Sequence, residues 1–388
     1  MQYNFDEYID RTNTNSIKWD YSEKLTGRKA LLPLWVADMD FRTPPEVLSA
    51  LQERVAHGIF GYARCPQSYL DALAGWLERR HGWTISDEWV VPVPGVVPAI
   101  RIALSAFTKP GDKVIIQPPV YYPFRNVIQR NGRRAVENPL VRAGNSYEMD
   151  FDQLEEIIDD DTRLFLLCSP HNPVGRVWRR DELDRLTEVC AKHHLILLSD
   201  EIHFDLIMPG NRHLPAGGLS PEAEKLSVTL TSATKTFNLS GLSYANAIVP
   251  DPALRRDLRH QLAVDALELP NVLALAGAEA GYRHGEPWLD ALLAYLAENY
   301  RFAANYLAEK APGLAVFPLE GTYLMWIDFA DMGIGDRELR ERLLDGGLWL
   351  DDGPMFGTGG QGFQRVNIAC PRSTLTKALE KIAAVARR

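Results

Sequence analysis

Three residues near the ends of strand-like runs carry the clearest chemical signal. Lys235 lies in Thr-Ser-Ala-Thr-Lys-Thr-Phe at 231–237, shortly after a β-rich run at 227–230. Asp200 directly follows an apolar run, and Asn172 lies in a Ser-Pro-His-Asn-Pro-Val-Gly stretch. Pyridoxal 5′-phosphate needs an amine that can form an imine, a carboxylate beside its pyridine nitrogen and hydroxyl groups around its phosphate. A lone lysine is usually a solvated surface charge, but the three residues together predict a pyridoxal 5′-phosphate site.

The elements that must position these residues follow an alternating pattern. Short apolar runs at 113–117, 164–168 and 195–199 are separated by longer helical stretches. The runs lack a polar alternation, which is typical of parallel strands covered by helices on both faces. Ligands in such α/β folds collect at the carboxyl ends of the strands. Asn172 and Asp200 each lie just beyond such an end.

A turn at 94–98 offers a second kind of ligand-binding group. It follows a strand-like run at 89–93 and opens a helix. The backbone amides near Val96 and Val97 could therefore face a phosphate, because the first turn of a helix has unpaired N–H groups and a positive dipole end. Such turns are common, so this signal alone is weak.

The domain organisation is expected to be twofold. From residue 287 onward, apolar residues keep helical spacing and predict a long helix that leads into a smaller domain. We expect an N-terminal segment at 1–45 that joins the small domain, a large cofactor-binding domain at 46–285 and a small C-terminal domain at 286–388.

Composition limits the classes of function. The chain has 388 residues, 46% of them hydrophobic and 24% charged, as in ordinary globular enzymes. A net charge of -9 without a basic block disfavours nucleic acid or an anionic membrane as a partner. Cys65, Cys168, Cys190 and Cys370 lack metal-ligand spacing, so we expect free thiols and no metal. The start of the chain does not resemble a signal peptide and no run reaches transmembrane length, so we expect a cytoplasmic protein.

Six separated motifs resemble those of fold-type I pyridoxal phosphate enzymes in the class I/II aminotransferase superfamily, and more narrowly the MalY/PatB-like cystathionine β-lyases, or C-S lyases. The motifs lie at 34–41, 61–62, 119–124, 199–203, 284–289 and 365–372. The resemblance covers nearly the whole chain. It implies a large domain with a mainly parallel central sheet covered by helices, plus a smaller α/β C-terminal domain.

The resemblance assigns roles around the cofactor ring. It makes Lys235 the imine-forming lysine and Asp200 the partner of the pyridinium nitrogen. A carboxylate at that place favours the protonated ring, which then accepts electrons more readily. Asn172 is expected to hydrogen-bond the phenolic oxygen of the ring, and Tyr121 to stack on its face. Tyr122 is the alternative to Tyr121, and either tyrosine could simply pack in the core.

Other cofactor contacts are expected around the phosphate. Ser232 should bind it, while Thr234 either binds it or braces the turn. Many relatives in the wider superfamily have an arginine eight residues after the lysine, but Ser243 stands there in this chain. The resemblance also implies a homodimer with shared active sites, in which Tyr62 contributes from a neighbouring subunit. His203 replaces a tyrosine of many aminotransferases, and either bonds near the cofactor oxygen or packs.

The substrate is expected to be an amino acid. The resemblance pairs Arg365 with its α-carboxylate, a task that suits a planar, permanently charged donor. Arg372 is a weaker candidate and fits a structural role better. The remaining residues expected beside the substrate are Asn172, Trp35, Val36, Ala37, Tyr62, Tyr323 and Phe356.

Three functions stay open at this point. The motifs at 35–41 and 284–289 favour a C-S β-lyase that converts cystathionine or related S-substituted cysteines to thiol, pyruvate and ammonia. An aminotransferase, or a specialised biosynthetic enzyme of the same scaffold, would use almost the same residues. A non-catalytic regulator is the third possibility, and the presence of both Lys235 and Asp200 argues against it.

Overall fold

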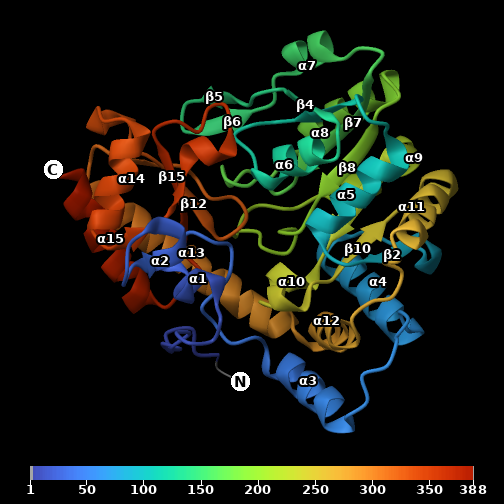
Figure 1. Cartoon of the computed structure of the whole chain (residues 1–388), viewed down its shortest axis with the longest axis horizontal. Coiled ribbons are helices and arrows are strands. Elements are labelled where there is room, and N and C mark those ends of the chain that lie inside the picture. The colour runs from blue at the N-terminus through green and yellow to red at the C-terminus, as the bar shows by residue number, and fades with distance from the viewer. Residues whose placement is uncertain (1–2, 388) are drawn as a thin grey trace.

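The computed structural model describes residues 3–387 and is built around a seven-stranded sheet (Figure 1). The strand order is β2-β10-β9-β8-β7-β3-β4. Strand β10 runs antiparallel to β2 and β9, while the pairs from β9 to β4 are parallel. This confirms the predicted mainly parallel sheet. In chain order the strands are β2 (Val90–Val93), β3 (Lys113–Ile116), β4 (Arg134–Glu137), β7 (Thr162–Cys168), β8 (Ile196–Asp200), β9 (Ser227–Thr231) and β10 (Ala245–Ile248).

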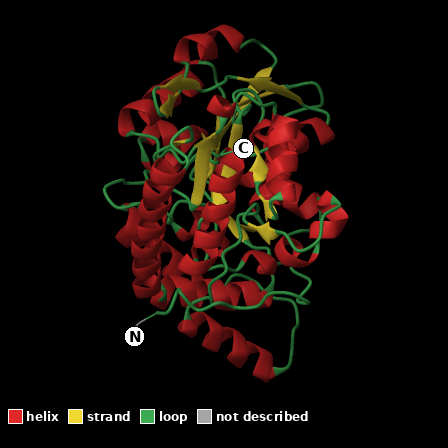
Figure 2. Cartoon of the chain, turned by 90° about the vertical axis from the view of Figure 1, so that its left-hand side faces the viewer, coloured by secondary structure: helices red, strands yellow, loops and turns green. Residues whose placement is uncertain are grey.

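Helices cover both faces of this sheet, and Figure 2 shows the strands enclosed between them. Helix α5 (Val96–Phe107) packs on α11 (Pro252–Val264) and contacts β8, β9 and β10, whereas α8 (Arg180–Lys192) contacts β8. Successive residues of one strand therefore enter two different cores. The core that includes α5 takes Val114, Leu164 and Leu198, and the core that includes α8 takes Ile115, Phe165 and Leu197. Burial on both faces is the reason that these runs are continuously apolar.

A second, four-stranded antiparallel sheet lies in the C-terminal part of the chain. Its order is β11 (Ala315–Val316), β12 (Leu324–Asp328), β15 (Phe363–Asn367) and β14 (Asp351–Asp352). It is accompanied by the long helix α13 (Glu286–Lys310), α14 (Asp336–Asp345) and α15 (Arg372–Ala386). The N-terminal segment joins this part, because β1 (Leu32–Pro33) pairs in parallel with β13 (Leu348–Trp349). The exact domain limits stay a prediction.

The remaining elements surround these sheets. Helix α3 projects at the lower edge of Figure 1 and packs against α12. Every helix within residues 3–387 is too short or too polar to span a membrane. The other helices are α1 (Ile17–Asp20), α2 (Ser22–Thr26), α3 (Pro45–His57), α4 (Gln67–His81), α6 (Pro123–Arg130), α7 (Phe151–Ile157), α9 (Pro221–Leu226), α10 (Ala233–Thr236) and α12 (Val272–His284), and β5 (Val141–Ala143) forms a hairpin with β6 (Ser146–Glu148).

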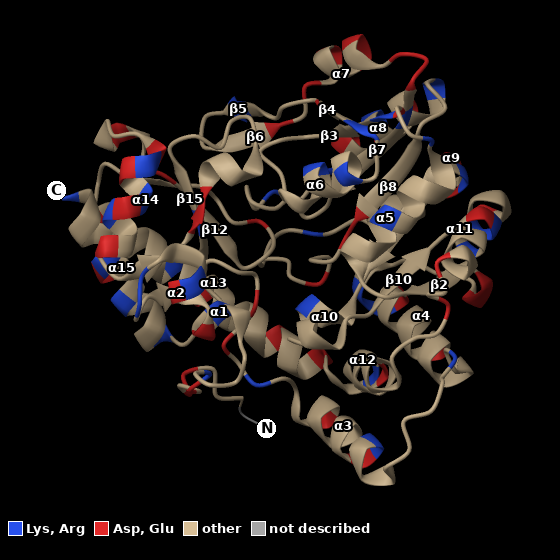
Figure 3. Cartoon of the chain, viewed as in Figure 1, with Lys and Arg blue, Asp and Glu red and all other residues tan. Residues whose placement is uncertain are grey.

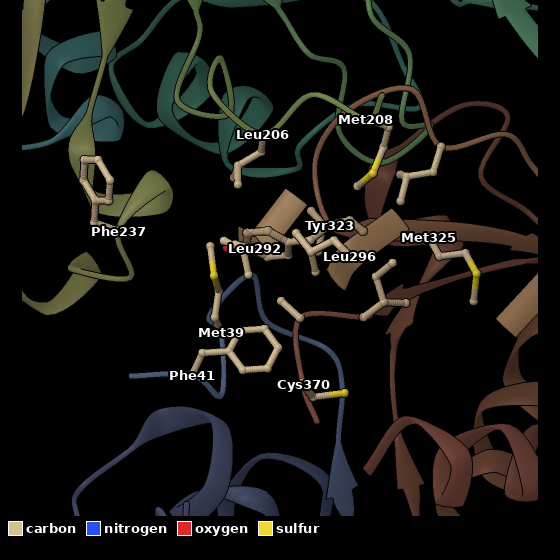
Figure 4. Close-up of a cluster of buried hydrophobic side chains, with 14 of the residues drawn as sticks. Met39, Phe41, Leu206, Met208, Phe237, Leu292, Leu296, Tyr323, Met325 and Cys370 are labelled. Carbon is tan, nitrogen blue, oxygen red and sulfur yellow. The ribbon is translucent and has the colours of Figure 1, made fainter. Parts of the chain in front are cut away.

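One apolar core ties the N-terminal segment to the rest of the molecule (Figure 4). Met39 and Phe41 of that segment belong to the same buried cluster as Phe237, Leu292 and Leu296. Phe237 follows α10, and the two leucines come from α13. The core thereby holds the segment that precedes Met39 beside α10.

A buried ionic network reinforces this attachment. Lys18 has no exposed surface, and its Nζ lies 2.7 Å from Oδ2 of Asp40. Arg11 bonds Asp38 at 2.8 Å and Asp40 at 2.9 Å. Elsewhere, acidic and basic residues are interspersed along the helices rather than gathered in blocks (Figure 3).

Candidate active site

Segments far apart in the chain meet around one cavity of about 270 Å³. It lies where β7 and β8 end, and the N-terminal segment, the start of α5, α10 and β15 complete its wall. Most of the predicted site residues line it: Trp35, Val36, Ala37, Val96, Val97, Tyr121, Asn172, Asp200, His203, Thr234, Lys235 and Arg365. The tertiary structure therefore brings Lys235, Asp200 and Asn172 together around one cavity.

Lys235 lies on α10 and points its amine at the N-terminal segment. Its Nζ donates hydrogen bonds to the carbonyl of Ala37 and, at 3.2 Å, to Oγ of Ser240. The pKa of Lys235 is lowered to about 8, mainly because the amine is buried, and the positive charge of Arg365 contributes to the lowering while Asp38 and Asp200 oppose it. A lysine with this pKa is largely a neutral, nucleophilic amine in mildly alkaline solution.

Asp200 ends β8 and is held by the backbone. Its Oδ1 accepts a hydrogen bond from the amide of Ile202 at 3.1 Å. Burial raises the pKa of Asp200 to about 7, and the charge of Lys235 opposes the shift. A cation beside this carboxylate would stabilise its charged form, as the protonated ring nitrogen of pyridoxal phosphate does.

Arg365 is held from three sides. Its Nη1 donates to Oδ1 of Asn172 at 2.9 Å, and its Nη2 donates to the carbonyl of Trp35 at 2.7 Å and to Asp351. The ring of Phe356 lies 5.0 Å from the guanidinium carbon. The arginine is therefore preorganised before any ligand binds.

Asp351 is a wall residue that the sequence analysis missed. It lies directly opposite Arg365 in the antiparallel pairing of β14 with β15. Burial raises the pKa of Asp351 to about 6, although Arg365 opposes the shift. A two-residue strand has too little periodicity to be recognised in a sequence, so no local signal marks this partner.

The start of α5 offers backbone donors. Gly95 has a φ of 128°, a conformation that a side chain would strain, and it lets the chain enter α5 at Val96. The amides of Val96 and Val97 belong to the first helical turn and have no carbonyl of the helix to bond. Hydroxyl-bearing residues of the wall, among them Thr234, Ser240, Ser243 and Tyr244, add further donors. Ser240 and Tyr244 were not predicted.

Ser232 lies outside the lining of this cavity. Its Oγ donates to the carbonyl of Tyr244 at 2.6 Å and accepts from the amide of Thr234 at 3.1 Å, which caps α10. The hydroxyl that the motif suggested for phosphate binding is thus engaged in holding the turn before Lys235. The Oγ atoms of Ser232 and Thr234 are 2.7 Å apart.

Other predicted residues also lie away from the lining. Tyr323 is buried, with its ring 5.7 Å from the ring of His203. Phe356 packs on Arg365 rather than facing the cavity. Tyr62 is 97% exposed and follows α3. Because the Tyr62 prediction invokes a neighbouring subunit, it stays a prediction.

Arg372 has a structural environment. Its Nε donates to Oδ1 of Asn299 at 2.8 Å, and its guanidinium stacks on the ring of Phe302 at 4.4 Å. These contacts fit the expectation that Arg365, rather than Arg372, binds the substrate.

The polar groups around the cavity fit pyridoxal 5′-phosphate. The wall has an amine, a carboxylate, hydroxyls and a helix start, which are the groups that this cofactor requires. Three buried nitrogens of wall residues also find no hydrogen-bond partner among residues 3–387: Trp35 Nε1, His203 Nδ1 and Arg365 Nε. Buried polar atoms are normally paired, so these atoms mark places where a polar ligand would bind.

Comparisons with known proteins find relatives of similar sequence and fold, among them structures that contain pyridoxal phosphate. Cystathionine beta-lyase PatB of Bacillus subtilis is 42% identical over 383 residues, which cover 98% of this chain and 99% of that protein. Protein MalY of Escherichia coli is 34% identical, with 97% of each chain covered. Cystalysin from Treponema denticola, whose crystal structure contains pyridoxal 5′-phosphate, matches with a TM-score of 0.97 at 35% identity, covering 100% of this chain and 99% of that one.

A second solved structure and a family profile complete the comparison. The pyridoxal phosphate-bound C-S lyase from Staphylococcus hominis has a TM-score of 0.93 at 31% identity, covering 100% of this chain and 99% of that one. The profile described as aminotransferase class I and II matches residues 29–382. The resemblance inferred from the six sequence motifs is confirmed. The chain belongs to the aminotransferase class I and II family.

Proposed function

We propose that this protein is a pyridoxal 5′-phosphate-dependent carbon-sulfur β-lyase that converts cystathionine or related S-substituted cysteines to thiol, pyruvate and ammonia. The observation that carries the proposal is the meeting of Lys235, Asp200 and Arg365 around one cavity. Full-length similarity to cystathionine β-lyases favours this reaction among those that the family performs.

Each of the three residues has a chemical task in this reaction. Bound pyridoxal phosphate supplies an electron sink for the negative charge that develops at the substrate Cα. Arg365 holds the α-carboxylate through charge-assisted hydrogen bonds. The Lys235 amine, with a pKa lowered to about 8, is suited to remove the Cα proton at neutral to mildly alkaline pH. Asp200 keeps the ring nitrogen protonated.

Further residues hold the cofactor and substrate in place. Asn172 links the two binding regions, because it contacts Arg365 and lines the same cavity. Tyr121 is proposed to cover the face of the ring, and burial raises its pKa, so the phenol stays neutral. The amides of Val96 and Val97 are proposed to bind the phosphate. Once the Cα proton has left, the sulfur at Cβ departs with the bonding electrons and is protonated to a thiol.

The proposal includes a homodimer with shared active sites. The end of α3 and the following loop expose several large apolar side chains: Val55, Ile59, Phe60 and Tyr62. Such a group is costly in water and is typical of a protein interface. Tyr62 would then reach the cofactor phosphate of the neighbouring subunit. A cytoplasmic location stays a prediction.

Transamination is the second candidate. The family profile itself is named for aminotransferases, and arginine-pyruvate transaminase AruH of Pseudomonas aeruginosa is 28% identical over 375 residues. In that reaction Lys235 would return the proton to the cofactor instead of allowing sulfur to leave. A purely regulatory role is disfavoured, because the cavity holds both the lysine and the aspartate that catalysis needs.

The deciding experiment mixes cofactor-loaded protein with L-cystathionine and no keto acid. Pyruvate, ammonia and free thiol are followed together. Equal amounts of all three over many turnovers support β-elimination. A single stoichiometric conversion of the cofactor to its aminated form would favour transamination and overturn the lyase proposal.

A further inference from the structure

The carboxylate of Asp351 is the feature of the cavity that the proposed reaction does not use. Asp351 and Arg365 form an ion pair whose side chains are 4% and 2% exposed. Both line the cavity. Within the described part of the chain, the second carboxylate oxygen of Asp351 accepts no hydrogen bond, so it is available to a ligand.

The ion pair changes the charge that a substrate meets. Arg365 and Asp351 together are neutral, so a bound α-carboxylate leaves one unbalanced negative charge beside them. Unbalanced charge is costly where water is excluded. A positive group on the substrate side chain would restore neutrality and give Asp351 a partner. The wall near Arg365 also has Trp35 and Tyr122, which can flank such a group.

The neighbouring charged residues already have other partners or tasks, so they are not available to a charged group on the substrate side chain. Asp352 follows Asp351 on β14, but its Oδ2 bonds Arg340 at 2.6 Å and its Oδ1 accepts from Gln364 at 3.2 Å. The charges of Lys235 and Asp200 serve the cofactor in the proposed function. Asp351 therefore remains the carboxylate that can take a cationic ligand group.

We propose that Asp351 is a specificity-determining residue that selects amino acids with a positively charged group beyond the sulfur atom, by holding that group while Arg365 holds the α-carboxylate. This inference rests on the proposed function, since it assumes that the cavity binds S-substituted cysteines. The competing interpretation is that Asp351 only orients Arg365. In that case, removing the charge of Asp351 would change the affinity for all carboxylate ligands by the same factor.

Two desamino ligands of matched shape test the inference on the cofactor-loaded protein. They are 3-(2-aminoethylthio)propanoate and 3-(propylthio)propanoate, which differ by an ammonium in place of a methyl group. Neither has the α-amine needed for elimination. An unchanged absorbance of the bound cofactor verifies that the terminal amine forms no imine, so calorimetry reports non-covalent binding. The wild-type protein should bind the ammonium ligand at least about tenfold more tightly, as expected for one charge-assisted hydrogen bond.

Substitution then assigns the preference to one carboxylate. Asp351→Asn should reduce the affinity ratio of the two ligands to about one, whereas Asp352→Asn, the same change one residue away, should preserve it. Equal affinities in the wild-type protein would overturn the inference without any variant. An unchanged ratio in Asp351→Asn, including an equal weakening of both ligands, would also overturn it.

The outcome is separable from that of the proposed function. Failure to release thiol from cystathionine would remove the lyase proposal, but a ligand preference that depends on Asp351 would still stand. Thiol release combined with equal affinity for the two ligands would support the lyase proposal and overturn the inference about Asp351.

Discussion

Oδ1 of Asn172 accepts a hydrogen bond from Nη1 of Arg365 at 2.9 Å. The contact joins a residue expected at the cofactor ring to a residue expected at the substrate carboxylate. The two residues are 193 positions apart in the chain. Asn172 lies in the loop after β7 of the seven-stranded sheet, and Arg365 lies in β15 of the four-stranded sheet. If both residues have the proposed roles, this hydrogen bond couples substrate binding to cofactor orientation.

Replacing Arg365 should impair substrate binding without preventing cofactor binding. We expect Arg365→Ala to weaken amino-acid binding at least about tenfold, because a charge-assisted hydrogen bond to the carboxylate is lost, while the colour of the bound cofactor persists. Apparent affinity from steady-state kinetics and the visible absorbance measure the two effects. Arg372→Ala, whose guanidinium contacts Asn299 and Phe302 instead, is the control. An unchanged affinity in Arg365→Ala would contradict the assigned role.

Lys235→Ala should abolish both turnover and the absorbance of the lysine-bound cofactor. Lys235 supplies the lysine amine among the described residues that line the cavity, so the variant has no such amine to form the imine. Absorbance after reconstitution, together with the cystathionine assay, measures both effects. Lys225→Ala changes an exposed lysine on α9 and should be silent. Full turnover in Lys235→Ala would refute the assignment.

Cofactor capture should depend on pH through Lys235. In cofactor-free protein the pKa of this lysine is lowered to about 8, so the neutral amine accumulates as pH rises through that value. Burial and Arg365 favour the neutral form, while Asp38 and Asp200 favour the ammonium form. The rate of imine formation with added pyridoxal phosphate should therefore rise with pH and level off above about 8. A midpoint near the ordinary lysine value of about 10.4 would show that burial does not control this amine.

Lys18 should contribute strongly to stability. Lys18→Met leaves the buried Asp40 without one of its two cationic partners, and breaking a buried ion pair typically costs about 3 to 5 kcal/mol. Lys29→Met is a matched control, because Lys29 is 76% exposed in its pair with Glu23 and exposed pairs contribute little. Urea unfolding of the cofactor-loaded protein compares the two. Equal free energies of unfolding would mean that Arg11 and the indole N–H of Trp19 suffice for Asp40.

Tyr62 tests the proposed dimer. In a single chain this residue is exposed and lies away from the cavity, so Tyr62→Ala should affect the cofactor only through a neighbouring subunit. We expect a several-fold loss of cofactor affinity in equilibrium dialysis, with Tyr8→Ala, another exposed tyrosine, as the control. Sedimentation measures the oligomeric state in parallel. A monomer with undiminished cofactor affinity would remove Tyr62 from the site.

The sequence by itself determined the types of chemical group and their local setting. Continuous apolar runs indicated a helix-covered parallel sheet, because burial on both strand faces leaves no polar alternation. Lys235, Asp200 and Asn172 were recognisable because each has a role that few other residue types can perform, and each is next to a strand end or turn.

The tertiary structure decided which of these groups face one another. Asp351 pairs with Arg365 through a two-residue strand, Ser232 turns its hydroxyl to the cap of α10, and Lys18 is buried against Asp40. Side-chain type and periodicity are local properties of a chain. Contacts between distant segments, and the direction in which a hydroxyl or carboxylate points, depend on how the two sheets and the N-terminal segment pack, which no local pattern contains.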